Sequence, residues 1–274
     1  MLECKELNVR AGWRRLLEGI DLRLAPGEFV AVLGENGAGK TTLLRALAGE
    51  RFEPALRASG AVRLNSRAID GYPVRARARL RAVLPQQSEA AFSFTSLEVA
   101  ALGRYAFGGG GEDDRRIARQ ALALADAAHL ERRELPTLSG GERARVHLAA
   151  VFAQLWERES DAARYLLLDE PTAALDLAHQ HHVLASARTF AAERGLGVLA
   201  ILHDLNLVAQ YADRVYVLRD GRLLAQGEPR QVLSPQLIAE GFAVAACVLA
   251  HPLKPAPLIA TAQRSAPAQE RACG

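Results

Sequence analysis

Gly34-Glu35-Asn36-Gly37-Ala38-Gly39-Lys40-Thr41 is the stretch of sequence that decides the fold of this chain. It matches the pattern G-x-x-x-x-G-K-[ST] at every fixed position. An apolar run (29–33) precedes it and a segment of helical character (42–47) follows it, so the context predicts a strand, a glycine loop and a helix. Such a loop turns successive backbone N–H groups toward an anion, and the positive end of the helix dipole adds to the attraction. A glycine-rich turn without a ligand is the alternative, and the complete pattern in this context disfavours it.

The side chains of this loop predict a nucleotide and a magnesium ion. Lys40 would reach the β- and γ-phosphates, and the hydroxyl of Thr41 would bind an Mg²⁺ ion that bridges phosphate oxygens. The predicted nucleotide-binding residues of the loop are Gly34, Asn36, Gly37, Ala38, Gly39, Lys40, Thr41 and Thr42.

Composition narrows the class of protein. The chain has 274 residues, of which 50% are hydrophobic, so it is long enough to bury a substantial core. Lys and Arg number 34 against 31 Asp and Glu, and a net charge of +3 is too small to argue for nucleic acid. No apolar run approaches the length of a bilayer span and the N-terminus lacks a signal-peptide layout, so we expect a cytosolic chain. The three cysteines are scattered, which disfavours a disulfide framework or a zinc site.

Two further apolar runs end in polar side chains suited to catalysis. Residues 165–168 predict a buried strand that ends at Asp169 and Glu170. Asp169 would hold the magnesium shell and Glu170 would orient or deprotonate the attacking water. Residues 197–202 repeat the pattern and place His203 at a strand end, where it could contact the γ-phosphate. The alternatives are solvated acids in a turn and a structural histidine.

A second candidate anion site lies in the middle of the chain. The apolar spacing becomes helical from 96 to about 156, and Leu138-Ser139-Gly140-Gly141-Glu142 opens the last of these helices. Ser139 and Glu142 have the spacing of a capping box. Because the two glycines leave backbone N–H groups bare, this helix start could bind an anion or could be no more than a cap.

The remaining segments predict the outer parts of the fold. Residues 2–9 and 20–24 predict two antiparallel strands before the phosphate-loop strand, and 61–65 and 81–85 predict two more. The alternating basic segment 75–81 is interpreted as a solvated face rather than a nucleic-acid patch, because no aromatic residues are interleaved with it.

Trp13 is the aromatic residue near the first loop and is therefore a candidate for stacking on adenine.

Taken together, residues 2–235 resemble the ATP-binding subunits of ABC transporters. The motifs stand in order: Walker A (34–41), a Q-loop at Gln86, the signature (138–142), Walker B (166–170), a D-loop around Asp176 and the switch residue His203. The resemblance implies an α/β P-loop NTPase fold: a RecA-like core, an antiparallel β subdomain and an α-helical signature subdomain at about 87–160. It also implies a nucleotide-binding domain over 1–250. The Pro- and Ala-rich tail (251–274) is expected to be poorly ordered.

The resemblance further implies how the site works. ATP would be sandwiched between two copies of the chain, so the active unit would be a homodimer. Ser139, Gly140 and Gly141 of one copy would face the γ-phosphate held by Lys40 of the other, with Asp176 near this interface. The catalytic residues would be Glu170, His203 and Gln86, and the Mg²⁺ ligands would be Thr41, Gln86 and Asp169. In the family an adenine-stacking residue lies about 29 positions before the lysine, at Ala11 here.

More narrowly, segments 91–94, 153–156, 175–180 and 203–206 look like hemin-importer ATP-binding subunits of the HmuV type, and the extra segment 156–164 fits them. This implies an ATPase at the cytoplasmic face of the inner membrane that drives heme uptake. Its partners would be a membrane permease dimer and, through the permease, a periplasmic heme-binding protein. The alternatives are a ferric-siderophore or cobalamin importer and, less favoured, a soluble ABC ATPase acting on nucleic acid. A P-loop kinase or GTPase leaves the signature without a role.

Three histidines, His179, His181 and His182, could be interpreted as heme or metal ligands. A polar helix surface is the preferred interpretation.

Overall fold

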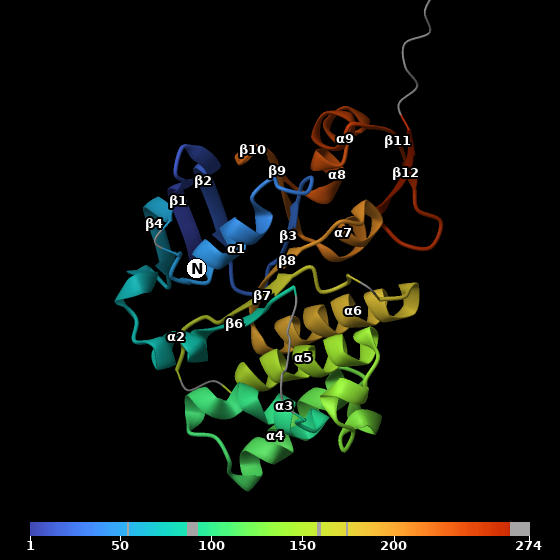
Figure 1. Ribbon diagram of the computed structural model, residues 1–274. Coiled ribbons are helices and arrows are strands. Elements are labelled where there is room, and N and C mark those ends of the chain that lie inside the picture. The colour runs from blue at the N-terminus through green and yellow to red at the C-terminus, as the bar shows by residue number, and fades with distance from the viewer. Residues whose placement is uncertain (54, 87–92, 158–159, 174, 264–274) are drawn as a thin grey trace, which may run out of the picture.

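The computed structural model describes residues 1–53, 55–86, 93–157, 160–173 and 175–263 (Figure 1). A six-stranded sheet forms its centre, in the order β10-β9-β3-β8-β7-β6. Strand β3 is parallel to β8 and β9, β7 is parallel to β6 and β8, and β10 pairs antiparallel with β9. The strands are β3 (Phe29–Leu33), β6 (Arg81–Leu84), β7 (Tyr165–Asp169), β8 (Gly197–Ile201), β9 (Arg214–Arg219) and β10 (Arg222–Gly227).

Three of the inner strands, β3, β7 and β8, are buried along their whole length. Continuous apolar runs of this kind are what a parallel sheet covered on both faces requires. Along β3 the side chains alternate between two cores: Phe29 and Ala31 belong to one cluster, and Val30 and Val32 to the other. The sheet is therefore a middle layer, and the carboxyl ends of its parallel strands lie along one edge.

A second sheet, antiparallel and four-stranded, lies beside helix α1 in the order β2-β1-β4-β5 (Figure 1). Leu43, Leu44 and Leu47 of α1 share a core with apolar residues of both sheets. The elements are β1 (Leu2–Ala11), β2 (Arg14–Leu24), α1 (Lys40–Leu47), β4 (Leu56–Leu64), β5 (Arg67–Ala68), the 3₁₀ turn η1 (Ile69–Gly71) and α2 (Val74–Leu80). The predicted antiparallel strands are confirmed.

Segment 75–81 is not simply a solvated face. It forms most of helix α2, and the Nε atoms of Arg75 and Arg79 both donate to the carbonyl oxygen of Ala106, at 3.1 and 2.9 Å. The arginines therefore tie α2 to the helical part of the molecule.

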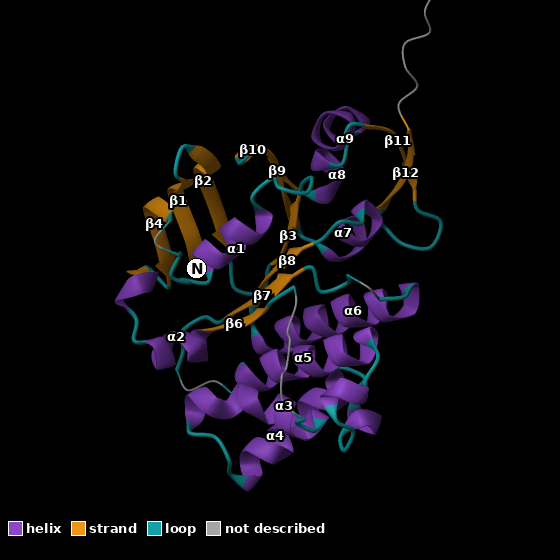
Figure 2. Ribbon diagram, viewed as in Figure 1, coloured by secondary structure: helices purple, strands orange, loops and turns teal. Residues whose placement is uncertain are grey.

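Helices lie on the other face of the central sheet (Figure 2). Of these, α5 (Gly140–Gln154) and α6 (Leu177–Arg194) lie next to the sheet, whereas α3 (Ser96–Leu102) and α4 (Glu112–Leu124) pack against α5 on its far side. Ser139 and Glu142 form the predicted capping box, with both hydrogen bonds present, and Thr95 and Glu98 form a second one. These elements are α3 (Ser96–Leu102), η2 (Gly103–Phe107), α4 (Glu112–Leu124), η3 (Ala128–Leu130), η4 (Leu135–Thr137), α5 (Gly140–Gln154) and α6 (Leu177–Arg194). The predicted helical region is confirmed, and no helix in the described ranges has the length and apolar character needed to cross a membrane.

The end of the chain differs from the prediction. After α7 (Leu205–Tyr211), α8 (Pro229–Val232) and α9 (Pro235–Phe242), strands β11 (Val244–Ala250) and β12 (Pro257–Gln263) pair antiparallel over seven residues. The expectation of poor order is therefore wrong for 257–263, because the prolines punctuate a hairpin loop rather than a tail. Ile259 is buried, and Asn206 anchors its backbone with two hydrogen bonds, at 2.7 and 3.1 Å.

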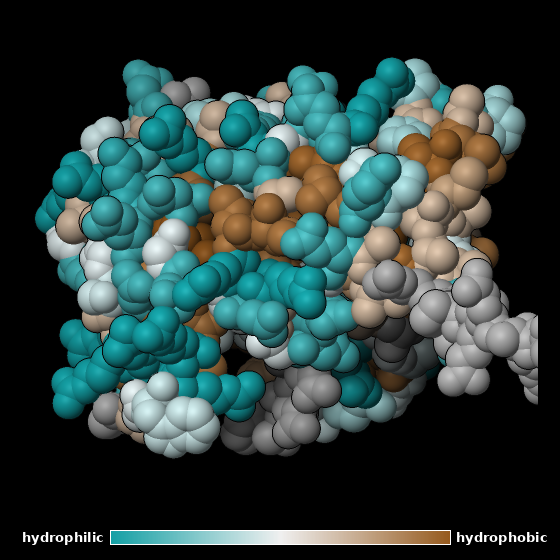
Figure 3. Space-filling model, turned by 90° about the horizontal axis from the view of Figure 1, so that it is seen from above, coloured by the Kyte–Doolittle hydropathy of each residue, from teal (hydrophilic) through white to brown (hydrophobic). Residues whose placement is uncertain are grey.

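Seen from above, apolar surface gathers on the side where this hairpin lies, and a second apolar area crosses the middle of the face (Figure 3). Residues 264–274 of the predicted tail, Ala91 and Phe92, and residues 158–159 of the extra segment lie outside the described residues.

Candidate functional site

The phosphate loop connects β3 to α1 and has two positions that only glycine fits. Gly34 has φ +149° and Gly39 has φ +99°. A Cβ atom on Gly34 would lie 2.3 Å from the carbonyl oxygen of Leu218, and one on Gly39 would lie 2.6 Å from that of Leu16. Both are too close for non-bonded atoms, so the loop is held between β9 and β2 at contacts that exclude a side chain.

Lys40 stands at the first position of α1 and is only 6% exposed. Its Nζ donates to the carbonyl oxygens of Gly34 and Glu35, at 2.8 and 2.9 Å, so the ammonium lies inside the curve of the loop. Burial lowers the pKa of Lys40, whereas the charges of Glu170 and Asp169 act to raise it. A phosphate group in the loop would bring the counter-charge that a buried ammonium needs.

A hydroxyl and a carboxylate meet next to this lysine. The Oγ1 of Thr41 donates to Oδ1 of Asp169 at 3.3 Å. Asp169, at the end of β7, is 4% exposed; burial raises its pKa and Glu170 adds to the rise, while the hydrogen bond from Thr41 opposes it. Hydroxyl and carboxylate oxygens are the ligands Mg²⁺ prefers, and this ion usually takes one or two carboxylates plus substrate phosphates. The pair therefore fits the predicted Mg²⁺ site.

Glu170 lies where three strand ends converge. Gln86 lies just beyond the end of β6, and its Nε2 donates a hydrogen bond to Oε2 of Glu170 at 2.7 Å. His203 lies just beyond the end of β8, and its Nε2 is 2.7 Å from Oε1 of Glu170. The backbone of Glu170 is in the left-handed region, with φ 51°, which a non-glycine residue adopts at a cost. The carboxylate is thus aimed and held on both sides, the arrangement expected of a group that must take a proton at a fixed place.

Apart from the buried Asp169, these side chains line one cleft of about 610 Å³, within the range typical of small-molecule sites. The predicted residues it brings together are Asn36, Gly37, Gly39, Lys40, Thr41, Thr42, Gln86, Glu170 and His203. Gly34 and Ala38 shape the loop without lining the cleft. Arg14 and Leu16 also line it, and sequence reasoning missed both; the available signal was their position in the strand that follows the first turn.

Trp13 is not brought into the cleft. It occupies the second position of the two-residue turn Gly12-Trp13 between β1 and β2 and is 94% exposed. A glycine with positive φ opens such a turn and leaves the next side chain at its tip. This placement gives no support to Trp13 as the adenine contact.

The signature residues Ser139, Gly140 and Gly141 do not line this cleft either. Ser139 and Gly140 are exposed at the start of α5, and a Cβ atom on Gly141 would lie 3.2 Å from Cδ2 of Leu175. The signature therefore packs against the segment that leads to Asp176 on one side and leaves Ser139 and Gly140 exposed on the other. This is the placement expected if they serve a nucleotide held by another copy of the chain.

Asp176 caps α6, and two of the histidines that follow it, His179 and His181, have partners within the fold, whereas Nε2 of His182 is buried without a hydrogen-bond partner among the described residues. Oδ1 of Asp176 accepts from the backbone N–H of His179 at 2.9 Å and lies 2.8 Å from its ring Nδ1. Nδ1 of His181 lies 2.9 Å from the hydroxyl of Tyr211. In the part of the chain that the structure describes, no group of three or more His, Cys, Asp and Glu side chains could hold a metal ion.

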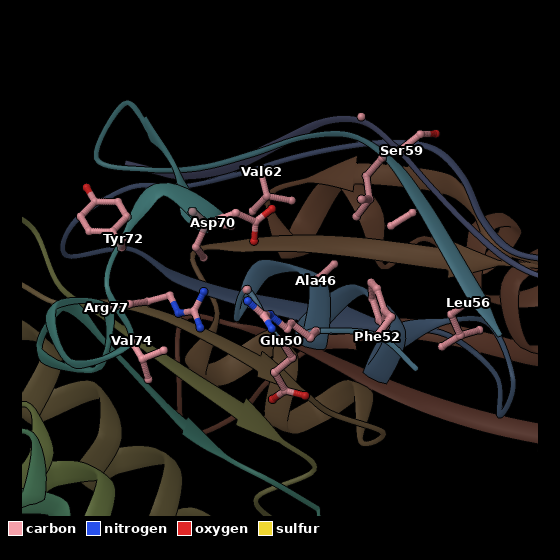
Figure 4. Close-up of a pocket in the computed structure, with 16 residues that line it drawn as sticks. Ala46, Glu50, Phe52, Leu56, Ser59, Val62, Asp70, Tyr72, Val74 and Arg77 are labelled. Atoms are coloured by element: carbon pink, nitrogen blue, oxygen red, sulfur yellow. The ribbon is translucent and has the colours of Figure 1, made fainter. Parts of the chain in front are cut away.

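A larger cavity, of about 880 Å³, opens on the far side of α1 (Figure 4). Strand β4 contributes Leu56, Ser59 and Val62, and the chain after α1 contributes Glu50 and Phe52. None of the predicted site residues lines it. The size of a cavity therefore does not identify the functional site in this molecule.

Comparison with known proteins agrees with the motifs. The model of the ABC transporter family matches residues 17–173. The hemin import ATP-binding protein HmuV of Gloeobacter violaceus is 52% identical over 94% of this chain and 93% of its own length. The protein of the same name from Pseudomonas aeruginosa is 49% identical over 94% and 99%.

Solved structures match the fold as well. A metal-chelate type ABC transporter in an inward-facing conformation has a chain that superposes with a TM-score of 0.76 at 26% identity, covering 96% of this chain and 97% of that one. A subunit of an ABC transporter complex from Clostridium perfringens reaches 0.70 at 26% identity, covering 87% and 92%. Because these matches extend over most of the chain, it belongs to the ATP-binding subunits of the ABC transporter family, among the hemin import proteins of the HmuV type.

Proposed function

We propose that this chain binds ATP with Mg²⁺ in the cleft beside the phosphate loop and hydrolyses it, as one of two identical ATP-binding subunits that power a membrane importer. The observation that carries the proposal is the carboxylate of Glu170, held between Gln86 and His203 in the same cleft as Lys40.

The chemistry follows from these positions. Lys40 balances the charge of the β- and γ-phosphates, and Thr41 and Asp169 would hold Mg²⁺, which when bound neutralises charge on the phosphate oxygens. Water attacks the γ-phosphorus and gives its proton to Glu170. The bond from that phosphorus to the bridging oxygen breaks, and ADP leaves with the electron pair. Gln86 and His203 position the carboxylate that receives the proton.

The position of the signature motif is the reason for proposing a second subunit. The start of α5 presents Ser139 and Gly140 to solvent and outside the chain's own cleft, where they would approach the γ-phosphate of the partner. In this arrangement two ATP molecules lie between two chains, and hydrolysis opens the pair. A permease of two membrane subunits would transmit the change, with this chain at the cytoplasmic face of the inner membrane.

The cargo proposed for the importer is heme. The support is the name that relatives about 50% identical over nearly the whole chain carry, and the cargo itself would pass through the permease without touching this chain. A cobalamin or ferric-siderophore cargo is the alternative, since the cleft chemistry is the same for all three.

The test is transport in a defined system. The chain is reconstituted with its permease in lipid vesicles, and a binding protein loaded with heme, vitamin B12 or a ferric siderophore is added outside. ATP-driven uptake of heme is the expected result. Uptake of cobalamin or siderophore but not heme would refute the cargo and leave the ATPase intact, whereas no ATP hydrolysis by the assembled transporter would refute the function as a whole.

A further inference from the structure

We propose that Asn206, held by strand β12, is a positioning residue that keeps His203 against Glu170, so that the hairpin at the end of the chain affects the rate of ATP hydrolysis. The inference rests on the proposed function, because His203 and Glu170 belong to the same cleft.

His203 depends on its backbone for its position. Its side chain is 46% exposed, and among the described residues its one polar partner is Glu170, with Oε1 at 2.7 Å from the ring Nε2. Because nearly half of the ring faces solvent, its direction is fixed only if the backbone on both sides is fixed. On the side of β8 this condition is met, since the N–H of Leu202 donates to the carbonyl oxygen of Val32 at 3.2 Å.

On its other side His203 is followed by α7, a helix of only seven residues. Asp204 caps it: its Oδ1 accepts from the N–H groups of Asn206 and Leu207, at 2.7 and 3.0 Å. A helix of two turns is not stable by itself, and its place in a fold comes from packing against its neighbours. What packs against α7 therefore decides where the backbone after His203 lies.

Strand β12 holds α7 by two directed hydrogen bonds. Nδ2 of Asn206 donates to the carbonyl oxygen of Ile259 at 3.1 Å, and the N–H of Ile259 donates to Oδ1 of Asn206 at 2.7 Å. The side-chain amide thus exchanges both bonds with one residue of the strand, as two paired strand residues do. Since two bonds join the same pair of residues, they fix the orientation of α7 as well as its distance from β12.

The hairpin also contacts α7 at its far end (Figure 1). Lys254, in the loop between β11 and β12, lies over the ring of Tyr211, with Nζ at 5.3 Å from the ring centroid. Ile259 is buried in the same apolar cluster as Leu207. The hairpin therefore holds α7 from its first turn to its last residue.

These contacts form a short route to the cleft. Asn206 is three residues beyond His203, and the capping residue Asp204 lies between them. If the amide of Asn206 is lost, the first turn of α7 and its cap are released from β12, and His203 loses its fixed place beside Glu170. The phosphate loop and Lys40 lie on β3 and α1, and this change leaves them untouched. Turnover should fall while ATP binding stays.

The experiment is a double-mutant cycle on the chain assembled with its permease in lipid. Wild type, Asn206→Ala, His203→Ala and the double variant are compared for phosphate release at saturating ATP. Labelled ATP and long incubation keep slow variants measurable. The Kd for ATP and the melting temperature are measured on the same preparations, and Asn206→Asp is added as the conservative variant.

Asn65→Ala is the matched control. The amide of Asn65 also joins distant segments outside the cleft: Nδ2 donates to the carbonyl oxygen of Ala163 at 2.8 Å, and Oδ1 accepts from the hydroxyl of Tyr165 at 3.3 Å. Its loss should lower the melting temperature and leave turnover at the wild-type value.

We expect Asn206→Ala to lower turnover by roughly 10- to 100-fold, because misplacing a catalytic group by about 1 Å can cost that much. The Kd for ATP should change by less than about threefold. In the His203→Ala background the same substitution should lower turnover by less than about twofold, because Asn206 acts through a side chain that is no longer there. Asn206→Asp keeps the acceptor for Ile259 and should recover part of the lost turnover.

Four results would overturn the proposal. They are wild-type turnover in Asn206→Ala, an equal loss from this substitution with and without His203, an equal loss in Asn65→Ala, and wild-type turnover in His203→Ala. A wild-type transporter that hydrolyses no ATP would instead count against the proposed function itself.

Discussion

Replacement of Glu170 by glutamine tests the centre of the proposed chemistry. The variant keeps the size of the side chain and removes its charge and its ability to take a proton. Glu170 now accepts from Gln86 and faces His203 with its other oxygen, both at 2.7 Å. A glutamine has one acceptor oxygen and one NH₂ group, so it can satisfy only one of these two partners as an acceptor.

The expected loss can be given a size. A positioned general base contributes about 10²- to 10⁴-fold to the rate of a proton transfer. At about 1.4 kcal/mol per tenfold, this corresponds to roughly 3–5 kcal/mol of barrier. We therefore expect the turnover of Glu170→Gln to fall by about 10²- to 10⁴-fold. The Kd for ATP should stay within about threefold, because Lys40 and the loop, which hold the phosphates, are untouched.

The assay uses the chain assembled with its permease in lipid. Phosphate release is measured at saturating ATP, and ATP binding is measured separately on the same preparation. Glu35→Gln is the matched control, since it makes the same charge change on an exposed side chain of the phosphate loop. Hydrolysis by Glu170→Gln at the wild-type rate would refute the assignment of this carboxylate as the proton acceptor, and an equal loss in Glu35→Gln would trace the effect to net charge.

Three further predictions follow from other contacts. Lys40→Ala should raise the Kd for ATP at least tenfold in calorimetry, because it removes the counter-charge inside the loop; unchanged binding would contradict this role. Asp169→Asn should abolish turnover. It should nevertheless raise the melting temperature, by about 2–4 °C for each kcal/mol added to the free energy of unfolding. The reason is that burial raises the pKa of this carboxyl and disfavours its charged form in the folded chain. That gain should shrink as pH falls and Asp169 becomes protonated, and a gain that grows in acid would have the wrong sign. Asn206→Ala should cost about 2 kcal/mol through the two lost hydrogen bonds to Ile259, and limited proteolysis should then cut the β11–β12 hairpin before the rest of the chain; equal rates of cleavage in the variant and the wild type would argue against this anchor.

Local sequence was enough to predict the parts of the site that depend on spacing. The phosphate loop needs glycine where the backbone has positive φ, and Gly34 and Gly39 have it. The capping box at Ser139 needs a glutamate three residues on, and Glu142 provides it. Asp169 ends a buried apolar run, so its strand and its place at the sheet edge could both be inferred.

Tertiary structure alone decided the features that depend on which residues meet across the fold. The contact of Glu170 with Gln86 and His203 joins positions 84 and 33 residues away, and no local pattern encodes such a pairing. The same holds for the hairpin at 244–263. Its prolines suggested a poorly ordered tail, whereas in the structure the pairing of β11 with β12 and the hydrogen bond from Asn206 hold the segment in place.

The turn between β1 and β2 is the clearest case of this division. Trp13 was the candidate for stacking on adenine because it is the aromatic residue near the first loop, whereas the spacing of the family pointed to Ala11. The two-residue turn sets its side chain outside, and the cross-strand pairing of Ala11 with Arg14 places a different side chain in the cleft. Sequence alone was enough to predict a phosphate-binding loop and the residues that form it, because those residues are neighbours along the chain. Only the fold could decide which side chain near the first turn lines the cleft, because one residue of register in a strand exchanges the inner face of a sheet for the outer one.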